Sequence, residues 1–272
     1  MKNLLGNHSA LSAACLVSRE WSTESSRVLF NLVFINMDRR PLDADWLETL
    51  KDSERVPANV RTLRMRAFEG FCQRRKGWRP PPVFECLFQA ILCLPNLRSL
   101  EFYWAHLSLG PGEKEALEQL QSKELSLQRL NIECIPFGAT TQHCYVRLLQ
   151  ALTSLEELYL GSNDKWGQLD GAAYLQLQEL PHAAPLRVKH VTIACCSALP
   201  LLDWICGALG PSPLDTDHIE SLEIPVYPES AVPNTPTVPC LKLLDSITAL
   251  CELKLNIPIA PSEERLTGMH RP

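Results

Sequence analysis

No stretch of this sequence is both long and apolar enough to cross a membrane. The best candidate, "CLFQAILCLP", ends at Pro95 after ten residues, whereas a transmembrane helix needs roughly 18 to 20. The opening "MKNLLGNHSALSAAC" also lacks the apolar core of a secretory signal peptide. We therefore expect a protein without a membrane partner, located in the cytoplasm or the nucleus.

The sequence also lacks an excess of basic charge. It has 26 Lys and Arg residues against 31 Asp and Glu, with a net charge of −5, whereas nucleic-acid-binding proteins leave a basic footprint. We therefore expect no nucleic-acid partner. A hydrophobic content of 46% with 21% charged residues excludes a disordered chain and is typical of a folded protein.

Sequence motifs that carry chemistry are missing as well. The chain has no Cys-x-x-Cys pair, His-Glu-x-x-His helix, Gly-rich phosphate loop or Gly-x-Ser-x-Gly turn. Its eleven cysteines are odd in number and irregularly spaced, which favours reduced thiols over disulfides. We predict no enzyme, no bound metal and no cofactor. A cysteine-dependent hydrolase that uses Cys144 or Cys196 is a distant alternative.

One short pattern returns along most of the chain: an aliphatic residue, two arbitrary ones, a second aliphatic, one arbitrary and a third apolar residue. Its eight copies start 28 to 37 residues apart, at Leu29, Val60, Leu97, Leu127, Leu155, Val188, Ile219 and Leu250. Apolar residues at helical spacing predict helices between them, at residues 43–52, 83–94, 113–121, 143–154, 172–180, 198–209 and 240–250. One unit of a short strand followed by a helix is therefore predicted to repeat, and stacking such units buries a continuous core.

This pattern resembles the leucine-rich repeat, L-x-x-L-x-L-x-x-N/C. Two copies match it through the ninth position, "LEELYLGSN" ending on Asn163 and "VKHVTIACC" ending on Cys196. The resemblance implies an α/β solenoid over residues 29–260, with parallel strands on the concave face and helices outside. The long and uneven period indicates a divergent member.

Side chains alternate between the two faces of a strand. If the first, fourth and sixth positions of each copy are buried, the third, fifth and seventh share the concave face, which solenoids use for binding. Tyr and Arg, both present there, are enriched at binding hot spots. The candidate substrate-binding residues are Arg64, Arg66, Glu101, Tyr103, Arg129, Asn131, Glu133, Glu157, Tyr159 and His190. A solvated sheet face that is polar without binding anything is the alternative for any one of them.

The segment before the repeats, "LSAACLVSREW" at residues 11–21, reads as one helix over residues 11–19, followed by a second over residues 22–29. It resembles the C-terminal half of an F-box, which docks onto the Skp-type adaptor of cullin–RING ubiquitin ligases. The matching positions are Leu11, Leu16, Val17, Arg19, Trp21, Leu29 and Phe30. The resemblance implies that residues 1–28 form a partial F-box whose adaptor contacts are Leu11, Cys15, Leu16, Val17 and Trp21. Such a segment followed by irregular repeats is similar to the large fungal set of these proteins.

The Leu-Pro-x-Glu helix that opens the family's module has no counterpart in "MKNLLGNHSA". We therefore expect the N-terminal half of the F-box to be missing. The alternative is that residues 11–21 only cap the open end of the repeat stack. Residues 261–272 are expected to form a tail.

These patterns lead to one hypothesis: a substrate-recognition subunit of an SCF-type cullin–RING ubiquitin ligase that holds a target protein on its concave face. Its implied partners are the Skp-type adaptor, the cullin complex and an unknown protein substrate. The alternative is a stand-alone leucine-rich repeat scaffold without ligase association.

Overall fold

The computed structural model describes residues 18–36, 44–53, 55–66, 83–103, 112–133, 139–162, 184–195, 200–208, 211–225 and 237–256, together with Ala13, Ala105 and Leu107. The strands are β1 (Leu32–Asn36), β2 (Thr62–Arg66), β3 (Ser99–Tyr103), β4 (Leu125–Glu133), β5 (Leu152–Ser162), β6 (Leu186–Cys195), β7 (Leu214–Asp215), β8 (Ser221–Pro225) and β9 (Glu252–Asn256). The helices are α2 (Arg19–Leu29), α3 (Ala44–Lys51), α4 (Arg55–Asn59), α6 (Val83–Cys93), α7 (Glu113–Gln121), α8 (Ala139–Gln150), α10 (Pro200–Ile205), α11 (Thr237–Ser246) and the 3-10 turn η2 (Thr216–His218).

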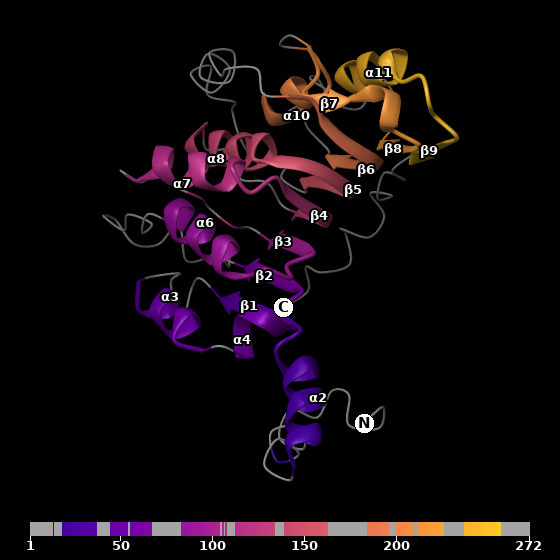
Figure 1. Ribbon diagram of the computed structural model, residues 1–272. Helices are drawn as coiled ribbons and strands as arrows, with labels where there is room; N and C mark the ends of the chain where they lie inside the picture. Colours follow the sequence, from indigo (N-terminus) through magenta and orange to yellow (C-terminus); the bar gives the residue numbers. More distant parts are fainter. Residues whose placement is uncertain are drawn as a thin grey trace, which may run out of the picture.

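The strands form one open, nine-stranded parallel sheet in the order β1-β2-β3-β4-β5-β6-β8-β9, with β7 paired to the start of β6. Helices α3, α6, α7 and α8 lie along one side of this sheet, each next to the following one (Figure 1). The fold is therefore a mixed α/β arrangement in which β1 to β6 pair in chain order, and β6 also pairs with β8 beyond the short strand β7.

The core lies between the sheet and these helices. In each of β2, β3 and β4 the fourth and sixth residues of the repeated pattern are fully buried: Leu63 and Met65, Leu100 and Phe102, Leu130 and Ile132. Parallel pairing aligns them, so that Leu63 lies beside Leu100, which lies beside Leu130. The alternation predicted for these strands is confirmed.

The first strand departs from the prediction by one residue. The copy starting at Leu29 put Leu32 and Phe34 in the core, but these side chains are 42% and 50% exposed, whereas Ile35 is 4% exposed. The cause is the register with β2, in which Val33 pairs with the buried Leu63 and Phe34 pairs with Arg64. Leu32 and Phe34 therefore lie on the same side of the sheet as Arg64.

The register of β1 predicts opposite results for two neighbouring substitutions. Ile35→Ala should lower the free energy of unfolding by about 2 kcal/mol, because it empties part of the core. Phe34→Ala should change it by no more than about 0.5 kcal/mol, because it truncates an exposed side chain. Urea unfolding of the two variants measures both values, and a larger loss for Phe34→Ala would show that the strand pairs in the other register.

Several helix boundaries differ from the predictions by up to four residues, and two of these differences change the assignment of a segment. The break expected between residues 19 and 22 is absent, because Ser22 N donates to Ser18 O at 2.8 Å and α2 runs without interruption from Arg19. The helix expected to continue to residue 154 ends at Gln150. Residues 152–154 belong to β5 instead, where Ser154 pairs with Ser126 of β4.

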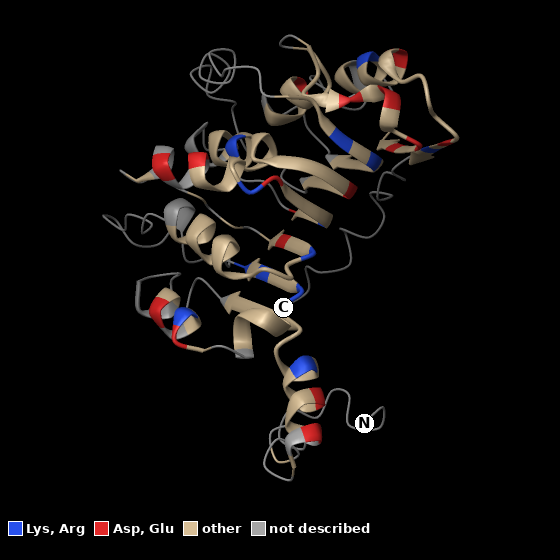
Figure 2. Cartoon of the chain, viewed as in Figure 1, with Lys and Arg blue, Asp and Glu red and all other residues tan. Residues whose placement is uncertain are grey.

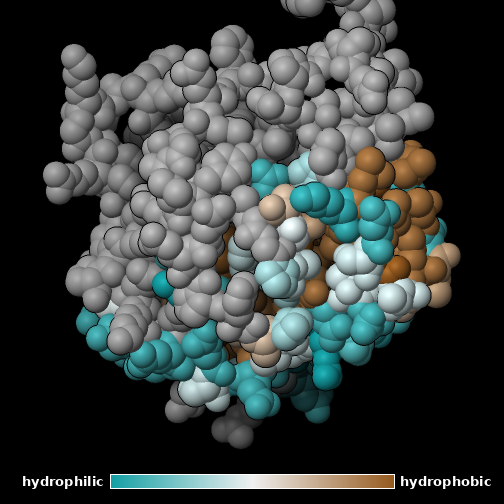
Figure 3. Space-filling view, turned by 90° about the horizontal axis from the view of Figure 1, so that it is seen from above, coloured by the Kyte–Doolittle hydropathy of each residue, from teal (hydrophilic) through white to brown (hydrophobic). Residues whose placement is uncertain are grey.

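The last strand is exposed on both sides. Leu253 and Leu255, predicted as core residues, are 42% and 56% exposed. In the described part of the chain, β9 has a strand neighbour on one side only, β8, so nothing there completes its burial. Figure 3 views this end of the molecule and shows hydrophobic residues gathered on part of its surface.

Candidate functional site

The side of the sheet opposite the core carries the predicted substrate-binding residues, in three adjacent rows across the strands. One row runs from Arg64 through Glu101 and Asn131 to Tyr159, a second from Arg66 through Tyr103 to Glu133, and a third from Arg129 through Glu157 to His190. We call these ten residues the polar sheet face. Parallel pairing without a shift between β2 and β4 brings the rows into line.

A hydrogen-bonded cluster occupies the β2–β4 part of this face. Arg64 Nε donates to Glu101 Oε2 at 2.6 Å, and the Tyr103 hydroxyl donates to the same oxygen at 3.4 Å. Asn131 Nδ2 donates to the Tyr103 hydroxyl at 3.3 Å, and the Arg64 guanidinium lies 5.6 Å from the centre of the Tyr103 ring. Glu101 is only 7% exposed. Its charge is therefore held between an arginine and a phenol rather than by bulk water.

This environment raises the pKa of two side chains in the cluster. The hydrogen bond to Glu101 raises the pKa of Arg64 above its usual value. Burial, followed by the negative charge of Glu101, raises the pKa of Tyr103. Tyr103 therefore stays protonated at neutral pH and remains a donor. Asn131 Oδ1 is buried and has no hydrogen-bond partner in the described part of the chain, so this cluster contains an unused acceptor.

The Arg129–Glu157 ion pair, next to this cluster, is more exposed to solvent. Arg129 Nε lies 3.1 Å from Glu157 Oε2, and both side chains are about half exposed, at 53% and 52%. Exposed pairs of this kind contribute little to stability. Both charges are therefore accessible to an approaching partner.

Gly161 and Phe34 belong to this surface but were not assigned to it from the sequence. A Cβ at Gly161 would lie 2.8 Å from Cε1 of Tyr159, so the glycine leaves the room that the Tyr159 ring occupies. Its place could have been predicted from the sequence, because Gly161 occupies the seventh pattern position, where β3 and β4 carry Tyr103 and Glu133. Phe34 was missed because it was placed in the core.

The structure describes little of the predicted adaptor-binding segment. Leu11, Cys15, Leu16 and Val17 lie outside the described residues, and Trp21 is placed by its backbone in the first turn of α2. The structure therefore gives no geometry for an adaptor surface.

The described ranges contain no group of three or more His, Cys, Asp and Glu side chains arranged to hold a metal ion. The side chain of Cys144 is fully buried on α8, and a nucleophile has to reach its substrate. Cys196 and Asn163 lie outside the described residues.

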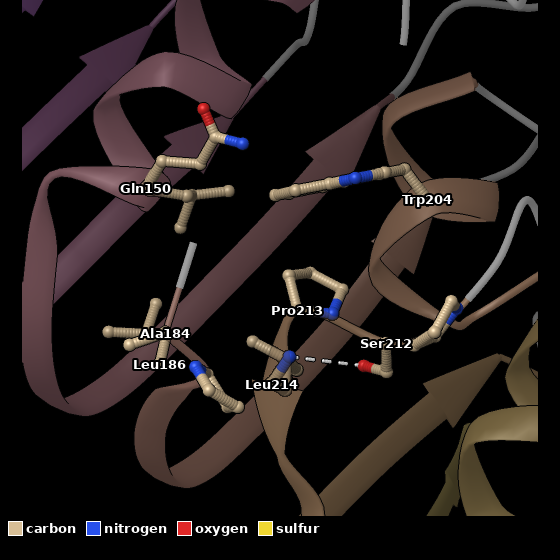
Figure 4. A pocket seen from close by; sticks show the side chains of 10 residues that line it. Gln150, Ala184, Leu186, Trp204, Ser212, Pro213 and Leu214 are labelled. Carbon is tan, nitrogen blue, oxygen red and sulfur yellow. Dashed lines mark hydrogen bonds between the residues drawn. The ribbon is translucent and has the colours of Figure 1, made fainter. Parts of the chain in front are cut away.

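An apolar cavity of about 160 Å³ lies between α8, α10 and the starts of β6 and β7. Figure 4 shows the Trp204 ring above Pro213, with Gln150 and Leu186 across from it. Ser212 Oγ accepts a hydrogen bond from Leu214 N at 3.1 Å and holds one wall in place. A cavity of this size has room for one apolar group about as large as a benzene ring.

No helix in the described part of the chain is long and apolar enough to span a membrane. Comparison with protein-family profiles, with curated proteins and with solved structures finds no match to this chain.

Proposed function

We propose that this chain is a substrate-recognition subunit of an SCF-type cullin–RING ubiquitin ligase, with a leucine-rich-repeat-type solenoid that binds its target on the polar sheet face. The likeness of residues 11–21 to the second half of an F-box supports the ligase connection. The parallel sheet with strands in chain order supports the repeat architecture. Such a subunit performs no chemistry and acts by bringing a target close to the ligase. The proposal locates the chain in the cytoplasm or nucleus.

The observation that carries target binding is the alignment of polar residues across neighbouring strands. Arg64, Glu101, Tyr103 and Asn131 are linked by hydrogen bonds before any partner arrives. Pre-ordered side chains lose less conformational entropy when a complex forms. Tyr and Arg are also the side chains that most often dominate binding energy at protein interfaces.

Target binding is tested by exchanging the Arg129–Glu157 pair. The double variant Arg129→Glu/Glu157→Arg keeps an ion pair within the chain but reverses the charges that a partner meets. We expect the amounts of specifically captured proteins to fall about fivefold to tenfold, because mismatched charges at an interface are repulsive. Quantitative affinity capture from cell extract, followed by direct binding to the purified target, measures the effect.

A matched control comes from α11, where Lys242 and Asp245 are exposed on the helix surface. The swap Lys242→Asp/Asp245→Lys should leave capture unchanged. Equal capture by the wild type and both swaps would remove the polar sheet face from the proposal.

The ligase connection is tested separately, with a purified Skp-type adaptor. We expect co-purification with the adaptor once a Leu-Pro-x-Glu helix is added before residue 1, and loss of it in Leu16→Glu/Trp21→Ala. If neither form binds the adaptor, the chain is a stand-alone protein-binding scaffold, and target capture on the sheet face is unaffected by that result.

A further inference from the structure

A polar depression lies at the starts of β4, β5 and β6. Its volume is about 510 Å³. We call it the strand-start groove and define it by six of its lining residues, Arg98, Ser126, Ser154, Glu156, Arg187 and Lys189. Neither the sequence patterns nor the proposed function assigns it a role.

Strand register brings these side chains together from segments far apart in the chain. Ser126 pairs with Ser154, and Ser154 pairs with Arg187, which forms one row across three strands. Two residues further along these strands, Gln128 N donates to Arg98 O and Glu220 N donates to Lys189 O, each at 2.8 Å. These bonds extend the row of Gln128, Glu156 and Lys189 to a further strand on each side. Arg98 and Lys189 are three strands apart, a span of about 14 Å at the usual strand spacing.

The lining is positively charged in a chain whose net charge is −5. The lining contains three basic residues, Arg98, Arg187 and Lys189, and one carboxylate, that of Glu156. In the described ranges, the side chains of Arg98 and Lys189 have no hydrogen-bonding or ionic partner. The basic positions of β6 are visible in Figure 2.

The nearby carboxylate of Asp215 does not neutralise Arg187 efficiently. His218 Nδ1 lies 2.9 Å from Asp215 Oδ2, while Arg187 Nε lies 3.9 Å from the same oxygen. The Arg187 side chain is 67% exposed. Its guanidinium is therefore available to a second anion.

We propose that the strand-start groove binds an acidic, extended peptide segment of a partner protein. In an extended chain, side chains four residues apart lie on the same side and about 13 Å from each other. Two carboxylates with this spacing match the separation of Arg98 and Lys189. Ser126 Oγ and Ser154 Oγ lie 2.6 Å apart, and their remaining hydrogen-bonding capacity suits peptide N–H and C=O groups. The inference does not depend on the proposed function, because the groove lies outside the polar sheet face.

The test uses the full chain and fluorescein-labelled peptides of Gly and Ser that carry two Glu residues four positions apart. Fluorescence anisotropy at about 0.1 M salt, where charges still interact over roughly 10 Å, should show saturable binding. We expect Arg98→Glu and Lys189→Glu each to weaken binding about tenfold, because each replaces an attraction with a repulsion. A peptide with two Lys residues in place of Glu should not bind.

Lys242→Glu on α11 serves as the control, since it makes the same change of charge on an exposed helix away from the groove. It should bind the acidic peptide as the wild type does, and circular dichroism should show that all variants remain folded. The inference is overturned if the acidic and basic peptides bind equally, or if Lys242→Glu loses as much affinity as Lys189→Glu. It is also overturned if single-stranded DNA binds the groove more tightly than the acidic peptide, which would indicate a general polyanion site.

Discussion

Phe102→Ala is expected to lower the free energy of unfolding by about 4 kcal/mol, the largest effect of any substitution considered. Phe102 lies in β3 and is fully buried, and truncation of a buried Phe to Ala typically costs 3 to 5 kcal/mol. Its ring meets the Tyr145 ring of α8 edge to face, with centroids 5.4 Å apart at 71°. The substitution therefore removes a contact between the sheet and the helix layer as well as apolar volume.

Urea unfolding of the wild type and Phe102→Ala measures this loss. Tyr145→Phe is the matched variant, because it keeps the aromatic pair and removes only the bond from the Tyr145 hydroxyl to Ala105 O, at 2.8 Å. Its expected cost is about 1 to 2 kcal/mol, the usual price of leaving one buried acceptor unpaired. A loss below about 1 kcal/mol for Phe102→Ala would contradict the packing of α8 against β3.

Arg64→Glu is expected to lower the free energy of unfolding by about 3 kcal/mol. The substitution removes the charge partner of Glu101, whose side chain is 9% exposed, and places a second carboxylate beside it. Breaking a buried ion pair by removing one partner costs about 3 to 5 kcal/mol, and the 39% exposure of Arg64 moves the expectation to the lower end of that range.

A second substitution separates this electrostatic effect from lost packing. Glu101→Gln in the Arg64→Glu background should recover most of the loss, because it removes the carboxylate that the new glutamate repels. Urea unfolding of the two single variants and the double variant gives the coupling energy between the sites. Simple additivity of the two single effects would mean that Arg64 and Glu101 do not interact in solution.

The repeated pattern was sufficient to predict most strands, because burial on one side of a sheet imposes a strict period of two. The prediction of buried residues failed at β1, because in "LFNLVF" and the residue after it both alternating sets of positions carry apolar side chains. Leu32 with Phe34 and Val33 with Ile35 are equally good core pairs by composition. Only the pairing of Val33 with Leu63 decides which of the two pairs is buried. This register depends on the neighbouring strand, so the sequence of β1 alone does not determine it.

The polar sheet face was predictable for the same reason, since alternation alone assigns Arg64, Glu101 and Asn131 to one side. Their mutual contacts were not predictable. Arg64 and Glu101 are 37 residues apart, and the bond between them depends on how the intervening segment returns the chain to the sheet. The strand-start groove could not be predicted from the pattern, because Glu156 and Lys189 occupy its second position, which alternation alone does not assign to a binding surface.

The order of the strands in the sheet determines where local unfolding should begin. From β1 to β6 each strand pairs with its neighbours along the chain, and β8 and β9 continue the sheet beyond β6, so cooperativity passes mainly between nearest neighbours. The middle strands β4, β5 and β6 are 9, 11 and 10 residues long, against 5 for β1 and β9. Local opening should therefore start at the two ends and reach the middle last, giving a gradient of amide protection along the sheet. The Arg129–Glu157 pair should therefore lie on the best-protected strands, whereas Phe34 and Leu255 lie on end strands whose opening should leave β4 and β5 intact.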